Sequence, residues 1–348
     1  MPSIVAAIVT HKRPAELRRL LKGLAASELP LTGCVISDHA PDGLTHGLAR
    51  ATPWETVVLE DPSNPGPGAG WANAARQALV QFPDLEALWY LDDDVVISAT
   101  DLGLLWQEME RGQAGAIAPL LEGADEHLWA FPEPVDRVAR QKIREARTAG
   151  EARKLLGAEP LPFCWCTGAC FLVSRTALDS TPLHRTDFWM LGEDLEYSMR
   201  IAAKNRAVFT CLVAVPHLPP KNIKEDLTQR TQRGRETNAE MEAYDLESAA
   251  DHPSNIQHPT SKINQASYLK FCSLLQNLSY LSFHAEESRH MKSYLPGNFR
   301  RFLRTHGLRW QTLQDALSCL WHGAVRGRPA GGRAGHSLRQ RASNRKAS

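Results

Sequence analysis

The sequence predicts an α/β protein in which a mostly parallel sheet is flanked by helices. Several short apolar runs show no alternation with polar residues, which is typical of strands covered on both faces. Helical periodicity separates some of these runs, as it does in repeated strand–helix–strand units. Polar side chains directly follow three of the runs, and ligands of such sheets bind beyond the carboxyl ends of the strands.

Four apolar runs in the N-terminal part of the chain are predicted strands. They comprise residues 4–10 (IVAAIVT), 35–38, 56–59 and 88–91 (LWYL). The polar clusters that follow are residues 10–13, 38–39 and 92–94. Because parallel strands bring their carboxyl ends to the same edge of a sheet, we expect these three clusters to meet there.

Two segments between these strands are predicted helices. After Pro14, leucines recur at spacings of three and four with basic residues between them, and residues 72–82 show a second helical pattern. The Gly-rich stretch 64–73 leads into this second helix. Its backbone N–H groups could approach a phosphate, but it has neither P-loop nor dinucleotide-binding spacing, and a plain connecting loop is the alternative.

The remaining chain is predicted to be less regular. A surface insertion or lid over 122–160 contains a charged helical piece, 135–156, and residues 163–173 are apolar again. A helix is expected from about Glu193, and a strand over 208–215 ends shortly before His217. Residues 219–325 are predicted to form a helical C-terminal region. Residues 326–348 hold seven Arg or Lys and no acid, and form a predicted disordered tail.

The composition is that of an ordinary globular protein. Of 348 residues, 43% are hydrophobic and 23% are charged, with a formal net charge of +1. These values exclude long disorder, a collagen-like chain and a strongly basic nucleic-acid binder. No stretch approaches the roughly 20 apolar residues of a membrane span. We therefore expect a cytoplasmic protein, or one bound peripherally to the inner membrane face.

The seven cysteines are odd in number and spread along the chain. Cys164, Cys166 and Cys170 form one cluster, but no fourth ligand follows at zinc-finger spacing. Buried free thiols are the favoured interpretation, and a zinc site is the alternative.

Asp92, Asp93 and Asp94 directly follow the predicted strand LWYL. Three adjacent carboxylates repel one another unless a cation lies among them. Mg²⁺ and Mn²⁺ prefer oxygen ligands and bridge readily to phosphates, so the run indicates a divalent metal site. A solvated turn or a helix N-terminus is the alternative, because aspartates also favour those positions.

The order of motifs resembles family 2 glycosyltransferases of the GT-A fold. The motifs are IVTHKRPAEL, VISDHA, SNPGPGAGWANAARQAL, LWYLDDDV, CTGACFLVSR and FWMLGEDLEYSMRI, and the resemblance covers roughly residues 3 to 218. The aspartate run and the later Glu-Asp pair before a helix are the most specific features of this resemblance. Within the family the pattern is similar to bacterial galactofuranosyl- and rhamnosyltransferase-like enzymes, which build cell-surface polysaccharides.

This resemblance implies roles for particular residues. Residues 1–218 would form the nucleotide-sugar-binding and catalytic domain. The donor would contact Thr10, His11, Arg13, Asp38, Trp71, Asn73, Asp92 and Asp93. Mn²⁺ or Mg²⁺ would be held by Asp92, Asp94 and His217. Glu193 or Asp194 would be the catalytic base, with Asp194 favoured by its position, although both could simply be helix N-terminal acids.

The implied reaction is an inverting, metal-dependent transfer of a sugar from a UDP- or dTDP-linked donor. The acceptor would be a hydroxyl of a cell-surface glycan or a lipid-linked molecule. Residues 299–348, rich in arginine and aromatic side chains, could contact an anionic membrane, and packing against the catalytic domain is the alternative. A sugar-nucleotide pyrophosphorylase and a non-catalytic nucleotide-sugar-binding protein are the competing functions. No nucleic-acid partner is expected.

Overall fold

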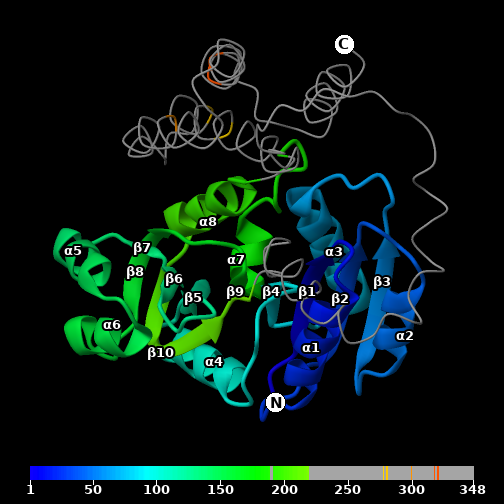
Figure 1. Ribbon diagram of the computed structural model, residues 1–348, viewed down its shortest axis with the longest axis horizontal. Helices are drawn as coiled ribbons and strands as arrows, with labels where there is room; N and C mark the ends of the chain where they lie inside the picture. Colours follow the sequence, from blue (N-terminus) through cyan, green and yellow to red (C-terminus); the bar gives the residue numbers. More distant parts are fainter. Residues whose placement is uncertain are drawn as a thin grey trace, which may run out of the picture.

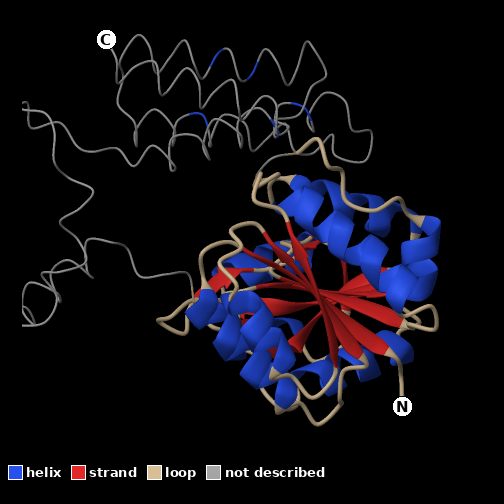
Figure 2. Ribbon diagram, turned by 90° about the vertical axis from the view of Figure 1, so that its right-hand side faces the viewer, coloured by secondary structure: helices blue, strands red, loops and turns tan. Residues whose placement is uncertain are grey.

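A mixed sheet forms the centre of the protein, with helices on both faces (Figures 1 and 2). The computed structural model describes residues 1–188 and 191–218, together with Asn277, Tyr280, Phe299, Leu317 and Leu320. The predicted helical region 219–325 and basic tail 326–348 otherwise lie outside the described residues. Within the described part, no helix has the length and apolar character that crossing a bilayer requires.

The strand order is β3-β2-β1-β4-β9-β5-β10-β8-β7, and β6 also pairs with β5. The strands are β1 (Ile4–Thr10), β2 (Gly33–Asp38), β3 (Glu55–Glu60), β4 (Ala87–Asp92), β5 (Ala116–Glu122), β6 (Leu128–Ala130), β7 (Glu133–Pro134), β8 (Leu161–Trp165), β9 (Cys170–Ser174) and β10 (Ala207–Pro216). The helices are α1 (Pro14–Ala25), α2 (Leu44–Arg50), α3 (Pro67–Gln81), α4 (Asp101–Arg111), α5 (Arg137–Glu145), α6 (Ala149–Leu156), α7 (Arg175–Ser180) and α8 (Glu193–Lys204).

The first four strands of this order are parallel, as predicted, and so are β5 and β10. Strand β9 runs antiparallel to both β4 and β5 and separates the two parallel groups. The predicted α/β class with a mostly parallel sheet is therefore confirmed, with one reversed strand in the middle.

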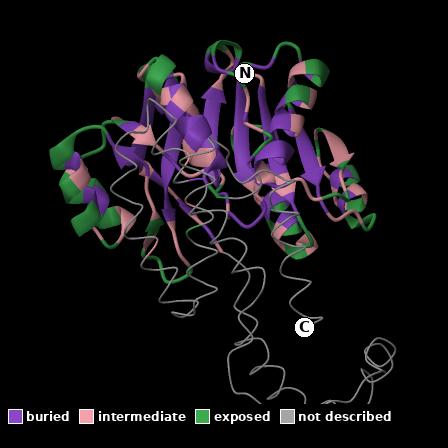
Figure 3. Cartoon of the chain, turned by 90° about the horizontal axis from the view of Figure 1, so that it is seen from above, coloured by how far each residue is buried: buried purple, intermediate pink, exposed green. Residues whose placement is uncertain are grey.

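The absence of alternation in β1 reflects burial on both faces of the sheet (Figure 3). Ile4 and Ile8 face a core cluster that contains leucines of α1 and α4. Val5 and Ala7 face a second cluster, which contains alanines of α3 and the buried Tyr197 of α8. Both clusters remove apolar side chains from water, so the strand must be apolar along its whole length.

Helix α3 begins at Pro67, five residues before the predicted start at residue 72. Proline suits the first helical turn, because its missing N–H would have no partner there and its φ is already helical. The glycines that suggested a loop form this first turn instead. A Cβ at Gly70 would lie 2.7 Å from the ring of His39, so the absence of a side chain allows close packing against β2.

The predicted insertion over 122–160 consists of a hairpin and two short helices. Strand β6 lies beside β5, and β7 pairs with β8. The single helical piece expected over 135–156 is broken into α5 and α6, because the Thr148 side chain accepts the N–H of Glu151 and starts a new helix. Ile143 and Ala152 are buried in the second core cluster.

The described cysteines are free thiols, in agreement with the favoured interpretation. Cys166 and Cys170 are buried, and this burial raises the pKa of both thiols. A buried, protonated thiol is a poor metal ligand. Cys164 is only partly buried, so within this cluster the predicted burial is confirmed for Cys166 and Cys170 alone.

We expect Gly33→Ala to destabilise the protein by about 1–3 kcal/mol, because an added methyl group would overlap the ring of Phe82 at the end of α3. The control is Gly47→Ala inside α2, where a Cβ would meet nothing within 4 Å. There alanine should be neutral or stabilise by about 0.5–1 kcal/mol. Urea unfolding midpoints measure both changes. Equal midpoints for the two variants would contradict this account of the β2–α3 contact.

Candidate active site

The carboxyl ends of β2, β1 and β4 lie side by side, as the sequence predicts. Thr10 is in register with Asp38, and Val9 is in register with Asp92. The polar residues that follow these strands therefore meet at one edge of the sheet. This edge is where α/β sheets bind ligands.

Asp93 is held by two donors from the end of β1. The Thr10 hydroxyl donates to one carboxylate oxygen at 2.7 Å, and Arg13 donates to the other at 3.0 Å. Arg13 also donates to Asp94 at 2.7 Å. The guanidinium expected at the nucleotide thus lies between two buried carboxylates, where its charge reduces their repulsion.

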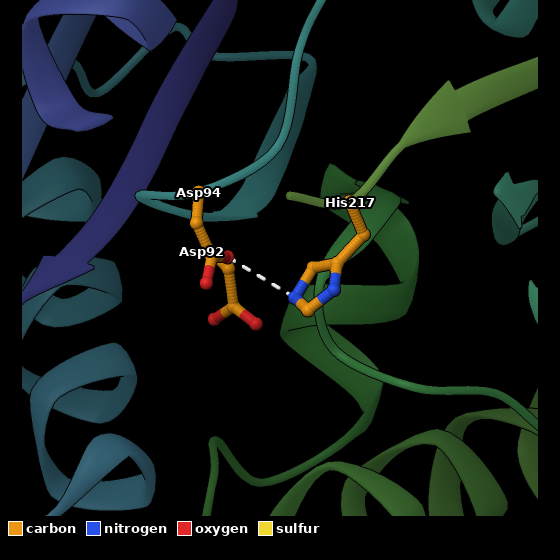
Figure 4. Close-up of side chains that lie close together, drawn as sticks. All are labelled: Asp92, Asp94 and His217. Atoms are coloured by element: carbon orange, nitrogen blue, oxygen red, sulfur yellow. Dashed lines mark ion pairs between the residues drawn. The ribbon is translucent and has the colours of Figure 1, made fainter. Parts of the chain in front are cut away.

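Asp92, Asp94 and His217 form a compact group of possible metal ligands (Figure 4). One ligand atom from each residue lies within 4.8 Å of the others. His217 follows β10, and its Nε2 lies 3.1 Å from Asp94 Oδ1. The backbone N–H of His217 donates to Glu122 at the end of β5 at 2.7 Å. The structure thus brings the three predicted ligands together from two distant strands.

The raised pKa values of Asp92 and Asp93 indicate that the site favours a bound positive charge. Burial and the neighbouring Asp94 together raise the pKa of Asp92 to about 7, although His217 opposes this. Burial also raises the pKa of Asp93 to about 6, although Arg13 opposes this. For Asp94, burial is outweighed by His217 and Arg13, which lower its pKa. A bound cation would favour the ionised form of all three carboxylates.

The chemistry of this group fits a hard divalent cation. Two carboxylates and one imidazole suit Mn²⁺, and the carboxylates suit Mg²⁺. With three protein ligands, coordination positions remain for ligand oxygens such as those of a diphosphate.

Glu193 and Asp194 lie in the first turn of α8, which begins at Glu193 as predicted. The preceding Gly192 has a φ of 101°, a conformation that favours glycine. Asp194 accepts the backbone N–H of Gly168 at 3.0 Å and that of Leu195 at 2.8 Å. Glu193 is buried, and its Oε2 has no hydrogen-bond partner among the described residues.

These two acids differ in how well their surroundings support a negative charge. Burial raises the pKa of Glu193 far above the ordinary value, and the charge of Asp194 raises it further. Burial also raises the pKa of Asp194, but its backbone donors favour the ionised form. These backbone donors therefore favour Asp194 over Glu193 as the ionised member of the pair. The charge of Asp194 also acts on Asp92.

Two further predicted donor residues are engaged in hydrogen bonds within the protein. Asp38 is buried and accepts the backbone N–H of Ala40 at 2.9 Å and the Thr45 hydroxyl at 2.6 Å. Exposed His11 has its Nδ1 3.1 Å from the carbonyl oxygen of His39. Both lie at the expected strand ends.

Trp71 and Asn73 differ in their exposure, although both belong to α3. The Trp71 ring is buried in the core and lies 5.3 Å from the His184 ring. Asn73 accepts a hydrogen bond from Arg76 at 2.7 Å and lines a pocket of about 350 Å³ at the ends of β2 and β3. The lining residues are Ser37, Leu59, Glu60, Asp61, Asn73, Arg76, Gln77 and Val80.

Two contributors to the site are not predicted from the sequence. The backbone N–H of Gly168 holds Asp194, and the Trp129 ring of β6 stacks on His217 with centroids 4.0 Å apart. The motif CTGAC contains Gly168, but a backbone donor has no side-chain signature. Trp129 lies in the insertion, where no periodicity points toward the site.

Comparisons with known proteins identify the family of this chain. A family model described as glycosyl transferase family 2 matches residues 5–180. Galactofuranosyltransferase GlfT1, from two strains of Mycobacterium tuberculosis, is 30% identical over 216 residues, which are 61% of this chain and 68% of that protein.

Solved structures share the fold at low sequence identity. The crystal structure of S. aureus TarS 1-349 matches with a TM-score of 0.53 and 13% identity, over 94% of this chain and 82% of that chain. The same protein in complex with UDP-GlcNAc matches with a TM-score of 0.52 and 14% identity, over 94% and 82% of the two chains. The extent of the family match and the identity to GlfT1 lead to one assignment: this chain belongs to glycosyl transferase family 2, has the GT-A fold and is a glycosyltransferase.

Proposed function

We propose that the protein is an inverting, divalent-metal-dependent glycosyltransferase that uses a nucleotide-sugar donor. The observation that carries this proposal is the group formed by Asp92, Asp94 and His217 beside the Glu193–Asp194 pair. The family assignment favours this reaction over the pyrophosphorylase and non-catalytic alternatives.

The residues of the site suggest a division of labour. A bound cation would supply positive charge to the departing diphosphate. Asp194 would accept the proton of the acceptor hydroxyl, since it remains a carboxylate beside neutral Glu193. The hydroxyl oxygen forms a bond to the anomeric carbon as the bond to the diphosphate breaks. Attack from the opposite face inverts that carbon.

The relatives support a proposal for the class of donor. TarS has been crystallised with UDP and with UDP-GlcNAc, and GlfT1 is named a galactofuranosyltransferase. A UDP-linked sugar is therefore our first choice of donor, with galactofuranose as the first sugar to test and dTDP as the other base to include. The proposed donor contacts remain those implied by the family resemblance: Thr10, His11, Arg13, Asp38, Trp71, Asn73, Asp92 and Asp93.

The acceptor is proposed to be a glycan hydroxyl or a lipid-linked molecule. The predicted membrane contact of residues 299–348 lies outside the described residues, apart from Phe299, Leu317 and Leu320. Cytoplasmic location, with or without peripheral membrane binding, is part of the same proposal.

A thermal-shift screen of UDP-, dTDP-, GDP- and CDP-sugars with Mn²⁺ or Mg²⁺ tests the donor and the metal together. We expect a UDP-sugar to raise the melting temperature only when the cation is present. In Asp94→Asn, cation affinity should fall by at least about tenfold, because a neutral amide replaces a charged ligand.

Asp84→Asn is the matched control, since Asp84 is exposed and precedes β4 at the opposite end of that strand. It should behave like the wild type. The proposed cation site would be contradicted if a UDP-sugar raised the melting temperature without any metal. It would also be contradicted if the rise in Asp94→Asn equalled that of the wild type.

We expect Asp194→Asn to lower kcat by about 10²–10⁴-fold, because an amide cannot accept the proton. Donor affinity should change little. Glu193→Gln replaces a neutral acid with a neutral amide of similar shape, so its kcat should fall much less. Measuring kcat and donor binding in both variants checks this order. The reverse order would assign the base role to Glu193.

The wild-type pH profile provides a separate test of the base. Asp194 must be ionised to accept a proton, and burial raises its pKa. Activity should therefore be lost on the acid side at a pH above the ordinary aspartate value of about 4. The measurement is kcat against pH at saturating donor, acceptor and Mn²⁺. An acid limb near pH 4 would show that the assay reports an ordinary, solvated carboxylate.

A further inference from the structure

Trp129 contributes a flat aromatic surface directly against the proposed metal ligand His217. Their ring centroids are 4.0 Å apart and the planes are inclined by only 17°, so the rings are stacked face to face. His217 is 6% exposed, whereas Trp129 is 50% exposed. One face of the indole thus covers the imidazole, while much of the side chain remains accessible to solvent.

His217 lacks the usual restraint on its second ring nitrogen. A metal-binding histidine normally donates its other N–H to a carboxylate or carbonyl, which fixes the orientation of the ring. The Nδ1 atom of His217 is buried and has no hydrogen-bond partner among the described residues. Its Nε2 faces Asp94 Oδ1 at 3.1 Å. The hydrogen bonds of the described chain therefore do not fix the ring from the Nδ1 side.

The hairpin after β5 brings Trp129 to this position. Its backbone is closed by a hydrogen bond from Gly123 N–H to the carbonyl of His127 at 2.8 Å, and Leu128 is in register with Glu122. The carbonyl of Glu122 accepts the N–H of His217 on the other side of β5. Trp129 and His217 thus extend from strands on either side of the same residue.

We propose that Trp129 is a positioning residue, which holds the His217 imidazole with Nε2 directed toward Asp94 and thereby raises the affinity of the cation site. This inference rests on the proposed metal function. Stacking restricts rotation of the His217 side chain. Less conformational entropy is therefore lost when a cation binds. It also couples the hairpin of residues 122–130 to the site.

The test is Mn²⁺ binding by the full-length protein, without donor or acceptor, measured by the EPR signal of free Mn²⁺. Trp129→Ala should weaken binding by about two- to tenfold, the range typical of an aromatic pair. Trp129→Phe keeps a flat ring and should bind within about twofold of the wild type. Val138→Ala removes another exposed apolar side chain of the insertion, 61% exposed, and should have no effect.

A second comparison separates positioning from general stability. In a His217→Ala background, Trp129→Ala should produce no further loss of Mn²⁺ affinity, because the residue through which it acts is gone. EPR counts free ion directly, so the weaker binding of this background can still be measured. Trp129→Leu, which keeps apolar bulk without a flat ring, should bind like Trp129→Ala and serves if the alanine variant does not fold.

Each result has a distinct meaning. The positioning role alone would be overturned if Trp129→Ala or Trp129→Leu bound Mn²⁺ with wild-type affinity. It would also be overturned if Trp129→Phe weakened binding as much as Trp129→Ala does, or if Val138→Ala weakened binding at all. A loss that persists in the His217→Ala background would do the same. Absence of Mn²⁺ binding by the wild type would overturn the cation part of the proposed function, and this inference with it.

Discussion

Repulsion between buried carboxylates is the constraint around which the active edge is built. Strand β4 ends at Asp92 and is followed directly by Asp93 and Asp94, and Asp194 at the start of α8 acts on the same region. Without positive charge, burial would keep several of them protonated, as the raised pKa of Asp92 indicates. Arg13 and His217 each lie beside Asp94, and the guanidinium of Arg13 supplies part of that charge.

These two residues contribute in different ways. Arg13 is permanently charged and ties Asp93 and Asp94 to the loop after β1. A histidine can lose its proton and become a metal ligand, so its place beside Asp94 is compatible with a cation between them. Arg13 thus stabilises the arrangement of the aspartates, while His217 leaves room for a cation to bind between itself and Asp94.

The sequence predicted the parts of the fold in which local pattern and long-range packing agree. The apolar run of β1, the strand before Asp92 and the start of α8 at Glu193 needed only periodicity and capping signals. No element was predicted between residues 101 and 122, although α4 and β5 lie there. The start of α3 was also missed, because glycines have low helix propensity. Close neighbours nevertheless favour glycine there: His39 beside Gly70, and the backbone of Arg185 beside Gly68.

The active site likewise contains features that the sequence predicts and features that it does not. Asp92, Asp94 and His217 could be named because their residue types carry metal chemistry, and the structure brings them together. The bonds of Arg13 to the aspartates and the stack of Trp129 on His217 depend on side-chain directions that no spacing encodes. Which of Glu193 and Asp194 is more readily ionised depends on the backbone N–H groups of Gly168 and Leu195. Gly168 belongs to the connection between β8 and β9, far from α8 in the sequence.

The reversed strand β9 has a consequence for how this enzyme could diversify. Because β9 runs against its neighbours, the turn that precedes it emerges at the same rim as the ends of β1 and β4. The turn before β9 therefore lies between the parallel strands β3, β2, β1 and β4 on one side and the later strands β5 and β10 on the other. Changes of length in the later segments can reshape one side of this rim while the register of β2, β1 and β4 on the other side stays intact.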